Sequence, residues 1–250
     1  MGERPEKTRL DQELVTRGLV VSRARAADLV RRGEVSVDGA TALKPAMPVS
    51  AATTIVLAPG AGAYVSRGAL KLRPALAHFG FDAAGRVCLD VGASTGGFTE
   101  ILLEAGARRV YAVDNGRGQL HPTLAADARV VSLEATDART LDRGLIPEPM
   151  TAIVADVSFI SLRKALPAAL CLAAAGCWLI ALVKPQFEAE PGIVRKDGTI
   201  VDPEMHASIV AHVESWLAAQ PGWRVAGLMP SPVKGGDGNT EFLMGAVHGG

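Results

Sequence analysis

Short apolar runs recur through the last two thirds of the chain, and segments of helical spacing separate most of them. Seven runs have the length of β-strands, and a helix is predicted in each of the first five connections. Strands that alternate with helices and are apolar almost throughout are typical of a mainly parallel sheet with both faces covered. The predicted strands are 87–91, 110–114, 130–133, 152–157, 178–183, 223–229 and 241–247.

Both ends of this sheet region have features of their own. The last two strands are joined by PSPVKGGDGNT, which has the composition of a loop and leaves no room for a helix. The seventh strand is therefore predicted to run antiparallel to its neighbour. Ahead of the first strand, SRGALKLRPALAHFG has helical spacing that places Leu70, Ala77 and Phe79 near one side. Pro74 within this helix predicts a kink or a late start.

A small module precedes the sheet. A helix is predicted over 10–17, and Ser22 is the expected N-cap of a second helix that ends at Gly33. The stretch EVSVDGA alternates and turns at Asp38-Gly39, which predicts a hairpin, and TTIVLAPG indicates a closing strand. These elements predict a small α+β domain.

The chain is expected to fold as two domains joined by a linker. APGAGA (58–63) has the small-residue composition of a linker. In the helix before it, Arg25, Asp28 and Arg32 have the i, i+3 and i+7 spacing of a surface ion-pair ladder. The predicted parts are an N-terminal domain over 1–57, a linker over 58–65 and an α/β domain over 66–250.

Composition narrows the class of protein only slightly. Of 250 residues 48% are hydrophobic, which suits a globular protein, and the 26 basic side chains balance the 26 acidic ones. The first 60 residues hold nine basic and seven acidic side chains, a bias too small to distinguish an RNA-binding surface from a solvated face. We expect no signal peptide, because the N-terminus is polar. The longest apolar stretch, 165–183, is interrupted by Pro167 and Gly176 and is unsuited to a membrane span.

The cysteines and histidines give no indication of a metal centre or of disulfides. No CxxC pair is present, and the cysteines lie in apolar surroundings, so we expect buried free thiols and a reducing, cytoplasmic compartment. The five histidines are scattered, so no metal site is expected. The cysteines are Cys88, Cys171 and Cys177.

The first predicted strand leads into a glycine-rich loop within LDVGASTGGFTEILLEAG (89–106). Glycines allow a sharp turn and a close approach to a ligand. A dinucleotide-binding loop has the spacing G-x-G-x-x-G and a P-loop contains Lys-Ser/Thr, whereas this loop has G-x-x-x-G-G. Asp90 precedes the loop, where a carboxylate would repel a pyrophosphate but suit an amino-bearing ligand.

Two further acids follow the next two strands. Asp114 comes 22 positions after Gly92, where a carboxylate can hold a ribose diol, and Asp137 can receive an adenine amino group. Tight packing at a strand–helix turn would also explain the loop alone. Together, the three acids and the glycines describe S-adenosylmethionine (SAM) better than NAD. The seven-stranded layout is that of the class I (Rossmann-like) SAM-dependent methyltransferase fold.

Four polar side chains stand where the apolar pattern would not place them. They are Lys71 in the helix before the sheet, Asp156 and Lys184 at the ends of the fourth and fifth strands, and Glu241 at the start of the seventh. The carboxyl ends of parallel strands and the start of an antiparallel last strand share one edge, so these positions can converge beside the loop. Each alone is also explained as a surface charge or a capping group, and for Lys71 that explanation is favoured.

A pair of lysines and a pair of carboxylates can form alternating ion pairs that hold a lysine in place. A ribose hydroxyl is a poor nucleophile. A lysine that accepts its proton, or stabilises the alkoxide, can activate it for attack on the sulfonium methyl group of SAM. This chemistry needs no metal.

At these residues the chain resembles a known family. DVGASTGGFT, VSRGALKL, ADVSFISL, KPQFE and GNTEF are similar to motifs of the TlyA family, within the FtsJ/RrmJ-like RNA 2′-O-methyltransferases. RLDQELVTRGLVVSRARAADLVRRGEVSVDGATALKPAMPV resembles an S4 RNA-binding domain, so the resemblance covers nearly the whole chain. One departure, Ser94-Thr95 where Ala-Pro is frequent, leaves the glycines and Asp90 in place.

The resemblance implies an activity and a set of residues. The expected reaction is SAM-dependent 2′-O-methylation of a cytidine in 23S rRNA and, in a longer subtype, also in 16S rRNA. Extra residues before Arg9 favour that subtype. The implied catalytic tetrad is Lys71, Asp156, Lys184 and Glu241. The implied SAM contacts are Asp90, Gly92, Ala93, Ser94, Thr95, Gly96, Gly97, Phe98, Asp114, Asp137 and Asp156.

The N-terminal module then has a role in binding ribosomal RNA. It contains no aromatic residue, so we expect recognition of shape and phosphates, with the target nucleotide flipped into the cleft of the other domain. The candidate RNA contacts are Arg9, Arg17, Arg23, Arg25, Arg31, Arg32, Lys44 and Arg67. The alternatives are a non-catalytic ribosome-assembly factor, against which the complete tetrad argues, and a membrane-active haemolysin, for which no membrane segment is found. We expect a monomer.

Overall fold

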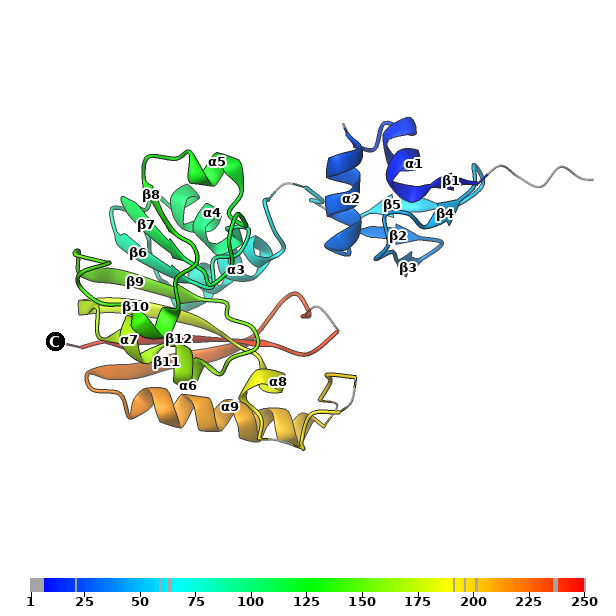
Figure 1. Cartoon of the computed structure of the whole chain (residues 1–250). Helices are drawn as coiled ribbons and strands as arrows, with labels where there is room; N and C mark the ends of the chain where they lie inside the picture. The colour runs from blue at the N-terminus through cyan, green and yellow to red at the C-terminus, as the bar shows by residue number, and fades with distance from the viewer. Residues whose placement is uncertain are drawn as a thin grey trace, which may run out of the picture. The chain divides into compact units, whose positions relative to one another are not determined.

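The computed structural model describes residues 7–20, 22–58, 60–62, 64–190, 192–195, 197–200, 202–235 and 238–249. The chain divides into two compact units between Ser66 and Arg67 (Figure 1). Residues 1–6 of the predicted first domain, including most of the extra residues before Arg9, and residues 59 and 63 of the predicted linker lie outside the described residues.

The N-terminal unit combines helices with short antiparallel strands. Its elements are β1 (Thr8–Arg9), α1 (Leu10–Thr16), α2 (Arg23–Arg31), β2 (Val35–Val37), β3 (Ala40–Thr41), β4 (Pro48–Val49) and β5 (Ile55–Leu57). Strand β2 pairs with both β3 and β5, and β1 pairs with β4. Leu10, Leu14 and Leu29 are fully buried and form the centre of a small apolar core.

Local signals in the sequence account for the elements of this unit. The Ser22 side chain accepts the backbone N–H of Arg25 and so caps α2, while Gly33 follows that helix with a φ of 70°. Asp38 and Gly39 both have positive φ, at 49° and 84°, as a two-residue hairpin turn requires. The predicted helices, hairpin and closing strand are therefore confirmed.

The C-terminal unit contains a seven-stranded sheet in the order β11-β12-β10-β9-β6-β7-β8. Its strands are β6 (Val87–Val91), β7 (Arg109–Val113), β8 (Val130–Leu133), β9 (Met150–Ala155), β10 (Ala173–Val183), β11 (Trp223–Pro230) and β12 (Phe242–His248). Strand β12 runs antiparallel to both neighbours, which confirms the prediction. Asp114, Asp156 and Glu241 stand just outside the strands to which the sequence assigned them, at one edge of the sheet.

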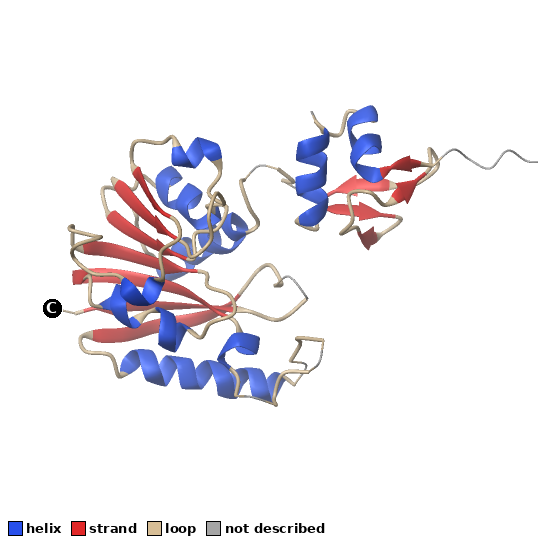
Figure 2. Ribbon diagram, viewed as in Figure 1, coloured by secondary structure: helices blue, strands red, loops and turns tan. Residues whose placement is uncertain are grey.

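Helices cover both faces of this sheet (Figure 2). They are α3 (Gly68–Phe79), α4 (Gly97–Glu104), α5 (Pro122–Ala125), the 3₁₀ helix η1 (Ala138–Thr140), α6 (Leu162–Ala165), α7 (Pro167–Leu170), α8 (Pro185–Glu188) and α9 (Pro203–Ala218). Leu89 and Val91 of β6 belong to the core that contains Leu162 of α6 and Val213 of α9. The prediction of a helix in each connection was too generous, because β8 and β9 are joined through the single turn of η1.

Helix α3 runs without interruption through Pro74 and corrects the predicted helix face. Its buried residues are Ala69, Lys71, Leu72, Ala75 and Leu76. Leu70 is 37% exposed and Ala77 is exposed, so two of the three residues predicted on the apolar side face solvent. Phe79 lies against Gly245 of β12, where a β-carbon would come within 2.7 Å of the ring. This contact sets which side of α3 meets the sheet.

The cysteines divide into two groups. Cys88 and Cys177 are buried, and burial raises the pKa of each thiol to about 12. Cys171 is exposed at the end of α7, so its predicted burial was wrong. Within the described part of the chain, no helix has both the length and the apolar character needed to cross a membrane.

Candidate active site

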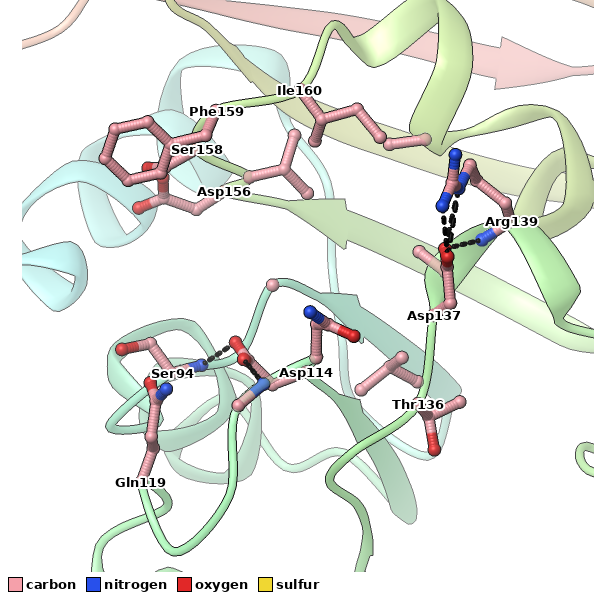
Figure 3. A pocket seen from close by; sticks show the side chains of 17 residues that line it. Ser94, Asp114, Gln119, Thr136, Asp137, Arg139, Asp156, Ser158, Phe159 and Ile160 are labelled. Atoms are coloured by element: carbon pink, nitrogen blue, oxygen red, sulfur yellow. Dashed lines mark hydrogen bonds and ion pairs between the residues drawn. The ribbon is translucent and has the colours of Figure 1, made fainter.

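A cavity of about 650 Å³ opens at the carboxyl edge of the sheet (Figure 3). Its walls come from the connections that follow β6, β7, β8 and β9. Of the predicted cofactor contacts, the walls contain Gly92, Ser94, Asp114, Asp137 and Asp156. The edge that the sequence predicted for the ligand is therefore the edge at which the structure has its cavity.

Gly92 joins the glycine loop to the segment that follows β9. Its φ is 85°, and a β-carbon would lie 2.6 Å from the carbonyl oxygen of Asp156. Nearby, the backbone N–H of Asp156 donates to the carbonyl of Val91 at 3.0 Å. Only glycine permits both this backbone conformation and this approach, so Gly92 sets the position of Asp156 beside the loop.

Asp114 ties the glycine loop to the turn after β7. Its Oδ2 accepts the N–H of Ser94 at 2.8 Å, and its Oδ1 accepts the N–H of Gly116 at 2.7 Å (Figure 3). Each carboxylate oxygen can accept a second hydrogen bond. The residue thus shapes the wall of the cavity and still offers acceptors to a diol.

Two more acids organise the opposite side of the cavity. Asp137 caps η1 and binds the guanidinium of Arg139, which lowers the pKa of Asp137 to about 2. Glu134 accepts three backbone N–H groups in 118–120, which lower the pKa of Glu134 and hold the loop that carries Gln119 into the cavity wall. The sequence analysis missed Glu134 and Arg139, although Glu134 follows its strand directly, as Asp114 does.

Asp90 does not lie in the cavity wall, which corrects its predicted place. The side chain is completely buried beneath the loop, where its Oδ2 accepts the Thr99 hydroxyl at 2.7 Å. Its Oδ1 has no hydrogen-bond partner among the described residues, and burial raises the pKa of Asp90 to about 7. Asp90 therefore links β6 to the first turn of α4 and does not line the cavity.

The rest of the predicted loop contacts do not line the cavity either. They are Ala93, Thr95, Gly96, Gly97 and Phe98. Gly96 packs against α5, since a β-carbon there would collide with the Leu124 side chain. Phe98 is 2% exposed and belongs to the core. Thr95 is exposed, and the other four are buried and support the loop from below.

The four predicted catalytic side chains form two ion pairs at this edge. Lys71 Nζ lies 2.6 Å from Glu241 Oε2, and Lys184 Nζ lies 2.7 Å from Asp156 Oδ1. The two pairs are neighbours in the sheet, because Lys184 follows Val183, which pairs with Phe242, and Glu241 precedes Phe242. The predicted convergence of four distant segments is therefore present.

Asp156 connects these pairs to the cavity. It lines the wall, whereas Lys71, Lys184 and Glu241 are each less than 10% exposed and stand behind it. Buried charges need partners, and each lysine here has one carboxylate. The surface-charge explanation that the sequence favoured for Lys71 is thus wrong.

Ser158 and Phe159 were missed as individual residues, although both lie within the quoted motif ADVSFISL. Ser158 Oγ accepts a hydrogen bond from Lys184 Nζ at 2.8 Å. Phe159 is 90% exposed with a φ of 64°, a strained conformation for an aromatic residue, and its ring lies 5.1 Å from that of Phe187. A second cavity of about 1010 Å³ adjoins the first. Arg139, Phe159 and Ile160 line both cavities.

Five of the predicted RNA contacts have partners within the N-terminal unit, and Arg17 and Arg32 have the least exposed side chains of the five. Arg17 donates to Glu13 and to backbone carbonyls in 50–53. Arg32 pairs with Asp28 and donates to a backbone carbonyl at 2.7 Å, with its side chain only 12% exposed. Both guanidinium groups hold the unit together and are poorly placed to reach RNA.

The remaining predicted cations are more accessible. Arg25 completes the predicted ladder with Asp28 and also binds the carbonyl of Gly62, while Arg9 and Arg23 share one carboxylate, that of Asp11. The others are Arg31 and Lys44, both exposed, and Arg67, which is half-buried before α3. Within the described segments, no hydrogen bond or ion pair engages the side chains of Arg31 and Lys44, so they are the freest of the predicted RNA contacts.

Comparison with known proteins identifies the family. The FtsJ-like methyltransferase model matches residues 64–247, and the S4 domain model matches residues 8–55. The 16S/23S rRNA (cytidine-2′-O)-methyltransferase TlyA of Mycobacterium tuberculosis is 46% identical over 239 residues, which cover 95% of this chain and 89% of that protein. This chain belongs to the TlyA family of FtsJ-like methyltransferases. The resemblance predicted from the motifs is confirmed.

Other members of the TlyA family agree with this assignment. The 23S rRNA (cytidine-2′-O)-methyltransferase TlyA of Campylobacter jejuni is 40% identical over 182 residues, which cover 72% of this chain and 69% of that one. A solved structure from Streptococcus thermophilus that carries the name hemolysin superposes with a TM-score of 0.76 at 37% identity, covering 99% of this chain and 90% of the other. The two-part organisation is thus shared along the whole chain.

SAM is the methyl donor of this methyltransferase, and the cavity suits it. Its volume lies in the range of small-molecule sites. Asp114 and Asp137 place carboxylates in its wall, and Asp156 stands where the two ion pairs adjoin the cavity. The individual SAM contacts stay a prediction.

Replacing Gly92 tests the contact between the loop and Asp156. We expect Gly92→Ala to lower methyl transfer about 100-fold, because a β-carbon would displace Asp156 from the cavity. Gly85→Ala is the matched control, since Gly85 also has a positive φ but nothing within 4 Å, and it lies before β6 and outside the cavity wall. Transfer rates and urea unfolding are measured for both variants. Equal rates in the two variants would contradict the role given to this contact.

The raised pKa of Asp90 predicts that the free energy of unfolding depends on pH. The folded chain keeps a proton on this carboxyl up to about pH 7, which the unfolded chain releases near pH 4, so stability falls as pH rises through this window. The loss between pH 5 and 8 is about 3 kcal/mol, and Asp90→Asn should abolish it in urea unfolding. Asp127→Asn is the control, because a lowered pKa at Asp127 acts only in more acidic solution. An unchanged pH dependence in Asp90→Asn would refute the assignment.

Proposed function

We propose that this chain methylates the 2′-hydroxyl of a cytidine in ribosomal RNA, in both 23S and 16S rRNA, with SAM as donor. The observation that carries the proposal is the ion pair between Lys184 and Asp156, because Asp156 lies in the wall of the cofactor cavity. A proton acceptor is thereby held next to the methyl donor. The names of the relatives from M. tuberculosis and C. jejuni support the cytidine 2′-O position.

Residues of this chain activate the ribose hydroxyl and hold the charged groups of the site in place. SAM brings an electrophilic methyl group when bound. Lys184 accepts the proton of the ribose hydroxyl or stabilises the alkoxide, and Asp156 keeps the lysine in place at 2.7 Å. The second pair, Lys71 with Glu241, anchors α3 to the start of β12 and completes the charged edge. No step requires a metal ion.

Phe159 suits a substrate that is single-stranded at the site. An exposed aromatic ring in a strained backbone conformation, at the border of two cavities, offers a stacking surface for a base. A flipped nucleotide gains such a surface when it leaves its helix. Lys164 in the wall of the second cavity is exposed and has no ion-pair partner among the described residues, so it adds positive charge for the RNA backbone.

The comparison of the two relatives bears on which subunit is methylated. The M. tuberculosis relative, named for both rRNAs, matches 95% of this chain, whereas the C. jejuni relative, named for 23S alone, matches 72%. This difference supports two substrates. A ribosomal substrate favours the cytoplasm as the site of action, and the expected monomer stays a prediction.

The alternatives explain less of the structure. A non-catalytic assembly factor would have no need of two buried lysine–carboxylate pairs, whose desolvation is costly. The haemolysin hypothesis has the name of relatives in its favour, but the described residues form a cavity of small-molecule size and include no helix that could cross a membrane. Leakage of liposomes by the purified protein alone would revive it.

Methyl transfer from tritiated SAM to unmethylated small and large subunits, tested separately, is the central experiment. We expect alkali-resistant label in both subunits, and a loss of about 100-fold or more in Lys184→Ala and Asp156→Ala. Asp127→Ala is the matched control, because Asp127 is similarly exposed and pairs with Arg129 away from the cavity. Normal transfer by the first two variants would refute the catalytic assignment, and label confined to the large subunit would refute the 16S part.

The cations of the N-terminal unit give a second prediction. Arg31→Ala with Lys44→Ala should weaken binding to ribosomal subunits and lower the salt slope by about 2, because two phosphate contacts are lost. The stability of this double variant should not change. Arg32→Ala should instead destabilise the unit by about 1–3 kcal/mol, since it removes the ion-pair partner of the buried Glu34 carboxylate and a hydrogen bond to a half-buried carbonyl. Filter binding at several salt concentrations and urea unfolding distinguish these effects, and the reverse pattern would contradict the assignment.

A further inference from the structure

The segment 156–158 presents two side chains to one lysine. Val157 packs into the core of the sheet domain, while Asp156 and Ser158 on either side of it both bind Lys184. Side chains two residues apart share a face when a chain continues in the direction of a strand. The register agrees, because Ala155 pairs with Ala181 and Ser158 and Lys184 each follow three residues later.

The Nζ atom of Lys184 therefore has two defined acceptors. It lies 2.7 Å from Asp156 Oδ1 and donates to Ser158 Oγ at 2.8 Å. A neutral amine carries two N–H bonds and one lone pair in a tetrahedral arrangement around nitrogen. When both N–H bonds point to these acceptors, a single direction remains for the lone pair, and in the ammonium form the third N–H points the same way.

We propose that Ser158 is a positioning residue whose hydroxyl directs the lone pair of Lys184 Nζ toward the 2′-hydroxyl that is methylated. The inference rests on the proposed function, which makes Lys184 the group that receives the proton. With Asp156 alone as acceptor, the amine would rotate about its Cε–Nζ bond and lose its alignment. Ser158 removes that freedom.

The surroundings of Lys184 are consistent with this role. Ser158 is exposed and lines the cofactor cavity (Figure 3), whereas the Lys184 to which it is hydrogen-bonded is only 8% exposed. On α8 the Phe187 ring lies 6.0 Å from Nζ. Next to Ser158, Phe159 has the strained φ of 64°, which marks a segment held in one conformation.

The step that this arrangement serves is balanced by the groups already named. The O–H bond of the ribose breaks and its proton passes to Lys184 Nζ. The ribose oxygen forms a bond to the methyl carbon, and the carbon–sulfur bond breaks, so that S-adenosylhomocysteine leaves with the electron pair. The alignment of Nζ governs the first transfer and not the binding of either substrate.

A pair of isosteric variants tests the proposal. Ser158 is exposed, so a larger side chain can be accommodated there. Ser158→Thr retains the hydroxyl and adds one methyl group. Ser158→Val has the shape of the threonine variant but lacks the hydroxyl. We expect Ser158→Thr to keep the single-turnover rate of methyl transfer within about threefold. Ser158→Val and Ser158→Ala should lose about tenfold or more, as for a lost hydrogen bond to a charged group. The Kd values for SAM and for the ribosomal subunit should stay within about twofold in all three.

Two results would overturn the inference. Equal rates in Ser158→Thr and Ser158→Val would show that the hydroxyl has no role, and a loss confined to the Kd values would mark Ser158 as a binding residue. Lys184→Ala, measured alongside, distinguishes the proposed role of Ser158 from the proposed catalytic role of Lys184. If Lys184→Ala is inactive while Ser158→Val is fully active, the role of Ser158 alone fails, whereas an active Lys184→Ala removes the catalytic assignment itself.

Discussion

The close approach of Gly92 to the Asp156 carbonyl is the constraint on which the site depends. It joins the glycine loop after β6 to Asp156 at the end of β9. Because the two backbones touch, the distance between the glycine loop and Asp156 is set by the sheet itself. Asp90 of β6 and Phe98 of α4 contribute from below by holding the loop to the core.

The second requirement is that charged groups stay ordered where water is scarce. Each buried lysine has a carboxylate within 2.7 Å, and each pair joins segments far apart in the chain. Lys71 and Glu241 attach α3 to the start of β12, and Phe79 against Gly245 fixes the other end of that helix. Such pairs add little net stability, but they leave one arrangement of the edge in which no charge is unpaired.

Much of this organisation was predictable, for reasons that particular residues make plain. Alternating apolar runs specify a parallel sheet, and a polar residue at the end of a run must lie at the edge, as Asp156 and Lys184 do. The predictions were wrong where contacts between residues distant in the sequence determine the burial or the partners of a side chain. Cys171 has apolar neighbours in the sequence but lies at the surface, and Arg17 resembles an RNA contact but its guanidinium binds carbonyls across its own unit.

The order of the elements, the antiparallel last strand, the glycine loop and the residues of the charged edge all follow from the sequence alone, because they depend on periodicity and on position relative to strand ends. The fold decides which loop residues face the cavity, that the lysines pair as Lys71–Glu241 and Lys184–Asp156, and that Ser158 joins the second pair. Pairing depends on strand register and on the packing of α3, which bring together residues from 26 to 170 positions apart and leave no local signal.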